Sequence, residues 1–312
     1  LPMLALVTAN CFGGGSVLAS VCERRVVTSH SLFGMSGPKL IERISGSADL
    51  VASDKEAVRA LLGGASRAAA SAGFVVVEDD EASYATAVRT WLRTRDPVEV
   101  PDAMLQRQRE ALRERLQRVG RWKEAAPSRW EGHGLGETLY RVTSTRAALQ
   151  RSGAFVFADL PAQSPVQLVG LLGAASATAV DAQQLSDAIA RLPSGVARLV
   201  ILLDCESHAA TAVDERVVLS EYLAMLALQM RQRHRQGTHV HLVVTGVTGG
   251  GIFAALSAAA SRVSMLPSAR LRVLPKAAMA AINKAEDEDR TTAAHARVTG
   301  SADDVLDQLT EA

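Results

Sequence analysis

Short apolar runs alternate along the chain with segments whose apolar residues recur at helical spacing. The apolar runs have the length of buried strands, which we expect at 4–10, 24–30, 73–80, 196–204, 238–246 and 262–266. The helical spacing predicts helices at 16–24, 39–44, 53–71, 81–93, 102–118, 181–191 and 212–235, and after Gly251 as far as about 261. Strands that alternate with helices predict an α/β fold with helical crossover connections.

Other segments predict a helix cap, a strand-rich region, a linker and a charged tail. Ser53 and Asp54 suit the N-cap of the helix expected at 53–71, and the stretch 139–173 is expected to be rich in strands. The stretch 120–137 contains glycine, proline and tryptophan without periodicity, which predicts a linker between two domains. The charged tail from 285 on is expected to end in a short helix.

Two glycine triplets, at 13–15 and 249–251, lie in matched blocks. Each block has a strand-like run, the triplet, an arginine, and a proline followed by lysine. Pro38 comes 13 positions after Arg25, and Pro275 comes 13 positions after Arg262. The match predicts two homologous domains. About 100 residues of the second domain precede its triplet but only about ten of the first, so we expect the first domain to lack its leading half.

Composition limits the kinds of partner and environment. The chain has 312 residues, of which 48% are hydrophobic and 21% charged, as is usual for globular proteins. A formal net charge of +1 offers no general attraction for nucleic acid, and no apolar run reaches the length of a membrane span. Three scattered cysteines cannot make a disulfide framework or a zinc site. We therefore expect a cytoplasmic protein that binds neither nucleic acid nor membranes.

A strand–glycine–helix turn has three possible uses. It can be a tight turn in which glycine merely relieves crowding, or it can bind phosphate at the helix N-terminus. Neither triplet belongs to a nucleotide-binding motif, which disfavours phosphate. The third use is an oxyanion hole, in which backbone N–H groups stabilise an enolate. The paired turns favour this use, with two facing half-sites made by Gly13, Gly14, Gly15, Gly249, Gly250 and Gly251.

The sequence around both turns resembles malonate decarboxylase. The stretch ANCFGGGSVLASVCERRVVTSHSLFGMSGPKLIE (9–42), with ASDK at 52–55, resembles the β subunit of that family. The segments 201–227 and 244–284 resemble its γ subunit, with an Asp-Glu pair opening a long helix, a Gly-Gly turn and a stretch that ends in lysine. The run from Cys205 to His208 and the Thr-Gly-Gly-Gly turn depart from the family pattern.

This resemblance implies an α/β chain of two crotonase-like domains in tandem, of the carboxyltransferase type, with the first truncated at its N-terminus. Residues 1–119 would be the C-terminal part of a β-like domain, 120–137 the linker, and 138–312 a γ-like domain. The implied reaction is decarboxylation of a malonyl thioester on an acyl carrier protein, giving the acetyl thioester and CO2. The implied substrate-binding residues are Phe12, Gly37, Pro38 and Thr248.

The resemblance also implies how the substrate arrives. The chain itself would bind no cofactor or metal, and the substrate would be carried on the phosphoribosyl-dephospho-CoA arm of the carrier protein. The expected partners are that carrier and the acyl and malonyl transferase subunits, in a hetero- or homo-oligomer. Two alternatives stay open: a carboxyltransferase that passes the malonyl carboxyl group to a biotin carrier protein, and an inactive crotonase-fold scaffold.

Several other residues admit a catalytic use beside an ordinary one. His208 follows a buried strand and could act as an acid, although a solvated loop histidine is favoured. His239 and His241 share a strand face, and a partly exposed face is favoured over a metal pair. Asp214 and Glu215 suit the positive end of a helix, which is enough to explain them. The five arginines of 106–118 could dock an acidic carrier, but a solvated helix face is favoured.

Overall fold

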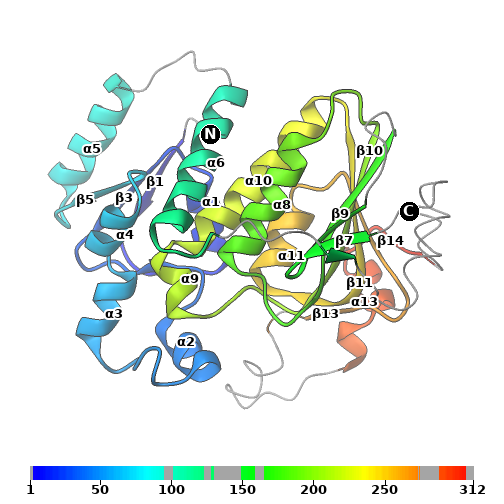
Figure 1. Ribbon diagram of the computed structural model, residues 1–312. Coiled ribbons are helices and arrows are strands. Elements are labelled where there is room, and N and C mark those ends of the chain that lie inside the picture. The colour runs from blue at the N-terminus through cyan, green and yellow to red at the C-terminus, as the bar shows by residue number, and fades with distance from the viewer. Residues whose placement is uncertain are drawn as a thin grey trace. The chain divides into compact units, whose positions relative to one another are not determined.

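The structure is a computed structural model that describes residues 3–94, 101–122, 128–129, 149–158, 165–272, 274 and 288–306 (Figure 1). The chain divides into two compact units. Unit 1 consists of Leu1–Arg115 and Ala209–Met225, and unit 2 of Leu116–His208 and Leu226–Ala312. Most of the predicted linker 120–137 lies outside the described residues, as does the repeated proline and lysine at 275–276.

Unit 1 is built on a parallel sheet of three strands in the order β1–β3–β5. These are β1 (Leu4–Val7), β3 (Arg24–Thr28) and β5 (Phe74–Val77), which confirms three of the predicted strands. A second parallel pair joins β2 (Cys11–Phe12) to β4 (Phe33–Gly34). One apolar core forms beneath these strands from Val7, Ala19, Val27, Phe33, Phe74 and Val218.

The helices of unit 1 follow the predicted positions with one correction. They are α1 (Gly14–Ser20), α2 (Pro38–Ser45), α3 (Lys55–Leu62), α4 (Gly64–Ala70), α5 (Glu81–Thr94) and α6 (Pro101–Arg118), whose last turn belongs to unit 2. The prediction of one helix over 53–71 is wrong, because the backbone is extended at Gly63 and starts again as α4. Gly64 lets α4 approach β3, since a Cβ there would lie 2.2 Å from the Thr28 carbonyl oxygen.

The predicted cap at the start of α3 is confirmed for Asp54. Its carboxylate accepts the backbone N–H groups of Glu56 and Ala57, both at 3.0 Å. Two of the N–H groups that a helix start leaves without acceptors are thereby satisfied.

The predicted helix over 212–235 is also two helices, α9 (Ala212–Arg216) and α10 (Leu219–Arg235). Val218 interrupts them with a φ of 61°, in the left-handed region that β-branched residues rarely adopt. Its side chain is fully buried in the core of unit 1. Burial of this valine holds a backbone conformation that costs roughly 1–3 kcal/mol.

Unit 2 contains a sheet of nine strands within the described residues, in the order β14–β12–β11–β10–β9–β8–β7–β6, with β13 paired to β11. The antiparallel part consists of β6 (Ser128–Arg129), β7 (Leu149–Ser152) and β8 (Phe155–Ala158). The parallel part consists of β9 (Val166–Ala174), β10 (Arg198–Cys205), β11 (His239–Gly249), β12 (Arg262–Met265), β13 (Arg270–Arg272) and β14 (Asp304–Val305).

The helices described in unit 2 alternate with these strands. They are α8 (Ala179–Arg191), the larger part of α10, α11 (Gly250–Ser257), a 3-10 turn at Glu288–Thr291 and α13 (Ala293–Val298). α11 ends four residues before the predicted boundary near 261, whereas the strand and helix predicted at 196–204 and 181–191 are confirmed. β14 occupies Asp304–Val305, and 307–312 lie outside the described residues, so the short helix expected at the end of the tail stays a prediction. The chain is therefore a mixed α/β protein.

Candidate functional site

The first glycine turn joins β2 to α1 and is held at one point by the neighbouring segment of unit 1. Gly13 is the N-cap of α1 with a φ of 61° and a ψ of −133°, a conformation that favours glycine. Its N–H donates to the carbonyl oxygen of Met35 at 3.1 Å. Ser16 closes the turn from inside, because its hydroxyl donates to the Gly13 carbonyl at 2.8 Å. Gly13 therefore fixes the turn, and its own N–H is already used.

Gly14 and Gly15 are the exposed part of this turn. They are the first two residues of α1, where N–H groups have no acceptor within the helix, and no acceptor for them occurs among the described residues. A Cβ on Gly14 would meet no atom within 4 Å, and one on Gly15 only the Cys11 sulfur at 3.6 Å. Two adjacent N–H groups without acceptors among the described residues thus lie at exposed positions at the positive end of a helix, an arrangement that suits an oxyanion.

The predicted substrate-binding residues of unit 1 gather beside this turn. Phe12 immediately precedes it, and a Cβ on Gly37 would lie 3.8 Å from the Phe12 ring. Gly37 is the N-cap of α2, and Pro38 is its first residue. The structure brings Phe12, the first glycine turn and the Gly37–Pro38 corner together, because β2 pairs with β4.

A buried carboxylate lies behind the segment that holds Gly13. Glu215 of α9 is fully buried, and its carboxylate accepts the N–H of Met35 at 3.2 Å and that of Ser36 at 2.6 Å. Burial raises the pKa of Glu215 to about 7, against the two N–H donors and the nearby Arg67, which lower it. The helix dipole alone does not account for Glu215. Its acceptor role cannot be read from the sequence, because its donors lie about 180 residues away.

The second glycine turn is built differently. β11 includes Gly249, where a Cβ would lie 2.0 Å from the Arg272 carbonyl oxygen of β13. Gly250 has a φ of 57°, and a Cβ there would lie 2.5 Å from the Ser207 hydroxyl oxygen and 2.9 Å from His208 Nδ1. The N–H of Gly251 donates to that Nδ1 at 3.0 Å. Close packing explains glycine at the first two positions, and the third donor is already engaged.

The preference for His208 as a solvated loop histidine is wrong. The residue is 7% exposed and lies where β10 ends, beside the second turn. Desolvation lowers its pKa to about 4, so the imidazole is neutral at pH 7. Because Nδ1 accepts the Gly251 N–H, the ring proton lies on Nε2. A neutral imidazole that accepts a backbone N–H shapes the turn and is a poor proton donor.

Thr248 and the cysteines near the turns are buried to different degrees. The Thr248 side chain is fully buried, and its hydroxyl has no hydrogen-bond partner among the described residues. Burial raises the pKa of Cys205 to about 12 and also raises that of Cys11, so both thiols are protonated at neutral pH. Neither cysteine has the lowered pKa of a nucleophile.

The paired histidines of β11 have different surroundings. His239 is exposed, whereas His241 is buried with Nε2 2.7 Å from the Ser264 hydroxyl. Within the described part of the chain, no cluster of three or more metal-ligating side chains occurs.

The arginine-rich helix α6 is only partly solvated. Arg115 turns inward and donates to the Glu221 carboxylate at 2.6 Å, and Arg25 pairs with the same carboxylate. Burial would raise the pKa of Glu221, but the two guanidinium groups hold it below its ordinary value. The preference for a solvated face is therefore wrong for Arg115, which belongs to a buried ion triad in unit 1.

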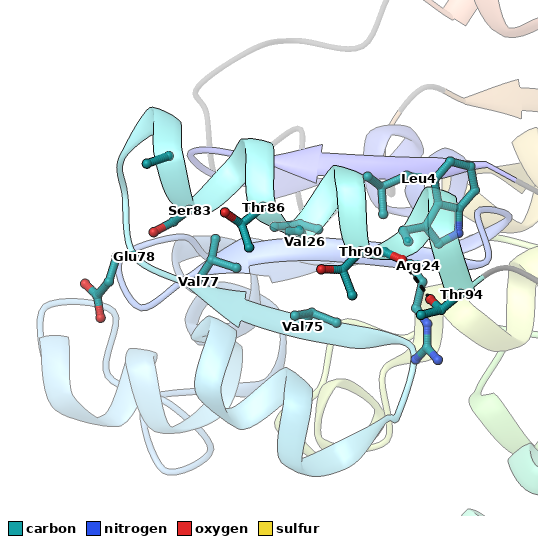
Figure 2. Close-up of a pocket in the computed structure, with 13 residues that line it drawn as sticks. Leu4, Arg24, Val26, Val75, Val77, Glu78, Ser83, Thr86, Thr90 and Thr94 are labelled. Atoms are coloured by element: carbon teal, nitrogen blue, oxygen red, sulfur yellow. Dashed lines mark hydrogen bonds between the residues drawn. The ribbon is translucent and has the colours of Figure 1, made fainter.

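A cavity of about 640 Å3 lies in unit 1 between α5 and the three-stranded sheet (Figure 2). Leu4, Val26, Val75 and Val77 form its apolar wall, and Figure 2 shows Ser83, Thr86, Thr90 and Thr94 of α5 along the opposite wall. α5 has no buried residue, so it covers the sheet only loosely. Among the described residues, no helix is long and apolar enough to cross a membrane.

Comparison with known proteins gives structural similarity without close sequence similarity. No protein-family model matches the chain. A search of curated proteins finds no match. Among solved structures, transcarboxylase 12S with methylmalonyl-coenzyme A and methylmalonic acid bound has a TM-score of 0.44 and 17% identity, covering 100% of this chain and 63% of that one. This chain thus spans less than two thirds of the transcarboxylase chain.

Two further solved structures are similar at the same level. The Pseudomonas malonate decarboxylase MdcD–MdcE hetero-dimer has a TM-score of 0.45 and 18% identity, covering 55% of this chain and 78% of that one. The beta subunit of P. aeruginosa geranyl-CoA carboxylase has a TM-score of 0.45 and 14% identity, covering 99% and 61%. The structural neighbours are therefore malonate decarboxylase and acyl-CoA carboxyltransferases, at low identity. That the two glycine turns face each other remains a prediction.

Proposed function

We propose that the chain takes part in decarboxylation of a malonyl thioester held on an acyl carrier protein. The products are the acetyl thioester and CO2. The observation that carries the proposal is the pair of N–H groups at the exposed Gly14 and Gly15, which have no acceptor among the described residues. They lie in a segment whose residues 9–42 resemble the malonate decarboxylase β subunit. The oligomer and the partner subunits expected from that resemblance are part of the same proposal.

The reaction needs a place for negative charge. The bond between C2 and the carboxylate carbon breaks, CO2 leaves, and the bonding electron pair passes to C2 and the thioester oxygen. The enolate then takes a proton at C2. The N–H groups of Gly14 and Gly15 would donate to the thioester oxygen, with little reorganisation because Gly13 and Ser16 already fix the turn.

The first turn suits this role better than the second. In the second turn, the Gly251 N–H is donated to His208, and the Cβ positions of Gly249 and Gly250 are occupied by neighbours. Loss of one oxyanion donor typically reduces kcat by about 100- to 1,000-fold. The Phe12 and Gly37–Pro38 surface beside the first turn would contact the acyl group.

A substitution that blocks the open turn without harming the fold tests the proposal. Gly14→Val places a branched side chain over the two donors, where the Cβ itself meets no neighbour. Leu18→Ala is the matched control, because Leu18 lies on the same helix and is 70% exposed. The assay follows 14C-labelled CO2 released from carrier-bound malonyl thioester by the full chain with its partner subunits.

We expect release by wild type and Leu18→Ala, and a loss of at least about 100-fold in folded Gly14→Val. Release unchanged in Gly14→Val contradicts the oxyanion role. Label transferred to a biotin carrier protein, with sensitivity to avidin, would show carboxyl transfer instead. Binding of the malonyl carrier without any release would show an inactive scaffold.

A further inference from the structure

Glu215 reaches the first glycine turn through a continuous chain of hydrogen bonds inside unit 1. Its carboxylate accepts the N–H groups of Met35 and Ser36, and the Met35 carbonyl accepts the N–H of Gly13 at 3.1 Å. All of these residues belong to the same compact unit. The carboxylate therefore acts on the turn through one short peptide segment, with no contact to the open donors themselves.

Gly34 makes room for this arrangement. A Cβ on Gly34 would lie 2.6 Å from Glu215 Oε2 and 2.8 Å from a methyl carbon of Leu62. The carboxylate can approach β4 this closely only because position 34 has no side chain. β4 also pairs with β2, with Gly34 opposite Phe12, the residue that precedes the turn.

The charges and hydrogen-bond donors around Glu215 determine how its buried carboxylate is stabilised. Arg67 of α4 donates to the Glu215 backbone carbonyl at 2.6 Å, and its positive charge lowers the pKa of the Glu215 carboxyl. Asp214 of the same helix is the neighbouring negative charge. A fully buried carboxylate costs several kcal/mol unless hydrogen bonds and charges compensate it. Two backbone donors from one segment and the positive charge of Arg67 supply this compensation.

We propose that Glu215 is a positioning residue for the oxyanion turn: its carboxylate fixes the Met35–Ser36 peptide, whose carbonyl orients Gly13 and so directs the N–H groups of Gly14 and Gly15 outward. This inference rests on the proposed function for its catalytic meaning. Its structural content, a coupling between the Glu215 carboxylate and the Gly13 amide, holds independently of which reaction the turn serves.

The first measurement needs no substrate and no variant. In 15N-labelled wild type, the amide signals of Met35, Ser36 and Gly13 are followed between pH 5 and pH 9. Burial raises the pKa of Glu215 to about 7, so the carboxylate titrates within this range. We expect the three amides to shift with one common midpoint. A Gly13 signal that stays constant while Met35 and Ser36 titrate overturns the coupling.

The second measurement uses variants. Glu215→Gln keeps the size of the side chain but offers only one acceptor oxygen, and Gly34→Ala displaces the carboxylate sterically. Glu221→Gln is the matched control, because Glu221 is another buried glutamate of unit 1 whose partners are Arg25, Arg115 and Ser71. Hydrogen exchange at Gly13 is compared at denaturant concentrations that give all proteins equal global stability.

We expect exchange at Gly13 to quicken by roughly tenfold or more in Glu215→Gln and Gly34→Ala, and to be unchanged in Glu221→Gln. In the decarboxylation assay, kcat should fall by about tenfold or more in Glu215→Gln with KM nearly constant, since only the developing charge needs the aligned donors. Equal exchange in the Glu215 and Glu221 variants overturns the proposal. No turnover by wild type contradicts the proposed function alone, because the amide titration still decides the coupling.

Discussion

The Nδ1 atom of His208 accepts the backbone N–H of Gly251 at 3.0 Å. In the first glycine turn the comparable hydrogen bond runs from the N–H of Gly13 to the backbone carbonyl of Met35. The first turn thus uses the N–H of its first glycine, and the second turn uses that of its third. The difference leaves two open donors in the first turn and occupies one in the second. The two turns therefore share a sequence pattern without sharing a hydrogen-bond pattern.

Stability should depend on pH through His208. Its folded pKa is about 4, against an ordinary 6.5, so the unfolded chain binds this proton in a range where the folded protein does not. Protonation of His208 does not affect the free energy of unfolding above about pH 6.5. The free energy of unfolding falls by about 2–3 kcal/mol as the pH is lowered towards 4, because protonation of His208 favours the unfolded chain. Urea denaturation of wild type and His208→Gln at several pH values measures it as a difference, since glutamine keeps an acceptor but does not titrate. A constant difference would contradict the prediction.

Alanine should be tolerated at the first turn and destabilising at the second. Gly14→Ala should change the free energy of unfolding by less than about 1 kcal/mol, because the position is open and helical. Gly250→Ala should cost roughly 1–3 kcal/mol, because φ is 57° and the new Cβ would meet Ser207 and His208. Urea denaturation followed by circular dichroism compares the two, and equal costs would argue against the described second turn.

Removal of the carboxylate from the buried ion triad should be severe. Glu221→Gln leaves the Arg25 and Arg115 guanidinium groups buried without a counter-charge, which should cost about 3–5 kcal/mol. Ser71→Ala serves as the control, because it removes only one hydrogen bond to the same carboxylate and should cost about 1 kcal/mol. Chemical denaturation measures both. Similar costs for the two variants would show that the triad adds nothing beyond its hydrogen bonds.

The helix α5 should open locally, well before unit 1 unfolds. None of its side chains is buried, and the cavity separates it from the sheet. Its amides should exchange with solvent much faster than those of β3. Thr90→Leu, which fills part of the cavity, should slow that exchange about fivefold by adding about 1 kcal/mol of apolar contact. Arg89→Leu, at a position that does not line the cavity, should leave the exchange rate unchanged.

Periodicity predicted most strands and helices because burial on one face leaves a direct trace in the sequence. It missed the breaks at Gly63 and Val218, where the cause is tertiary. Gly64 must approach the Thr28 carbonyl, and Val218 is held at positive φ by the core around it. Neither neighbour is visible from local spacing.

In the candidate site, too, the sequence revealed local features but not those that depend on distant segments. The glycine triplets stood out in the sequence because glycine is costly between a strand and a helix. The separate roles of Gly13, Gly14 and Gly15 could not be predicted from the sequence, because they depend on which N–H group donates to the Met35 carbonyl. Glu215 and His208 were visible only as polar residues near element ends. Their burial is set by packing with distant segments, which a single sequence does not report.

The assignment of residues 209–225 to unit 1 has a consequence for how the protein can be divided. A cut within 120–137 would leave the first fragment with the guanidinium groups of Arg25 and Arg115, while the Glu221 carboxylate that pairs with both remained on the second. Such fragments should aggregate when expressed separately and regain solubility when co-expressed. The two fragments would then fold only together, because the second fragment supplies residues 209–225 to the unit formed by the first.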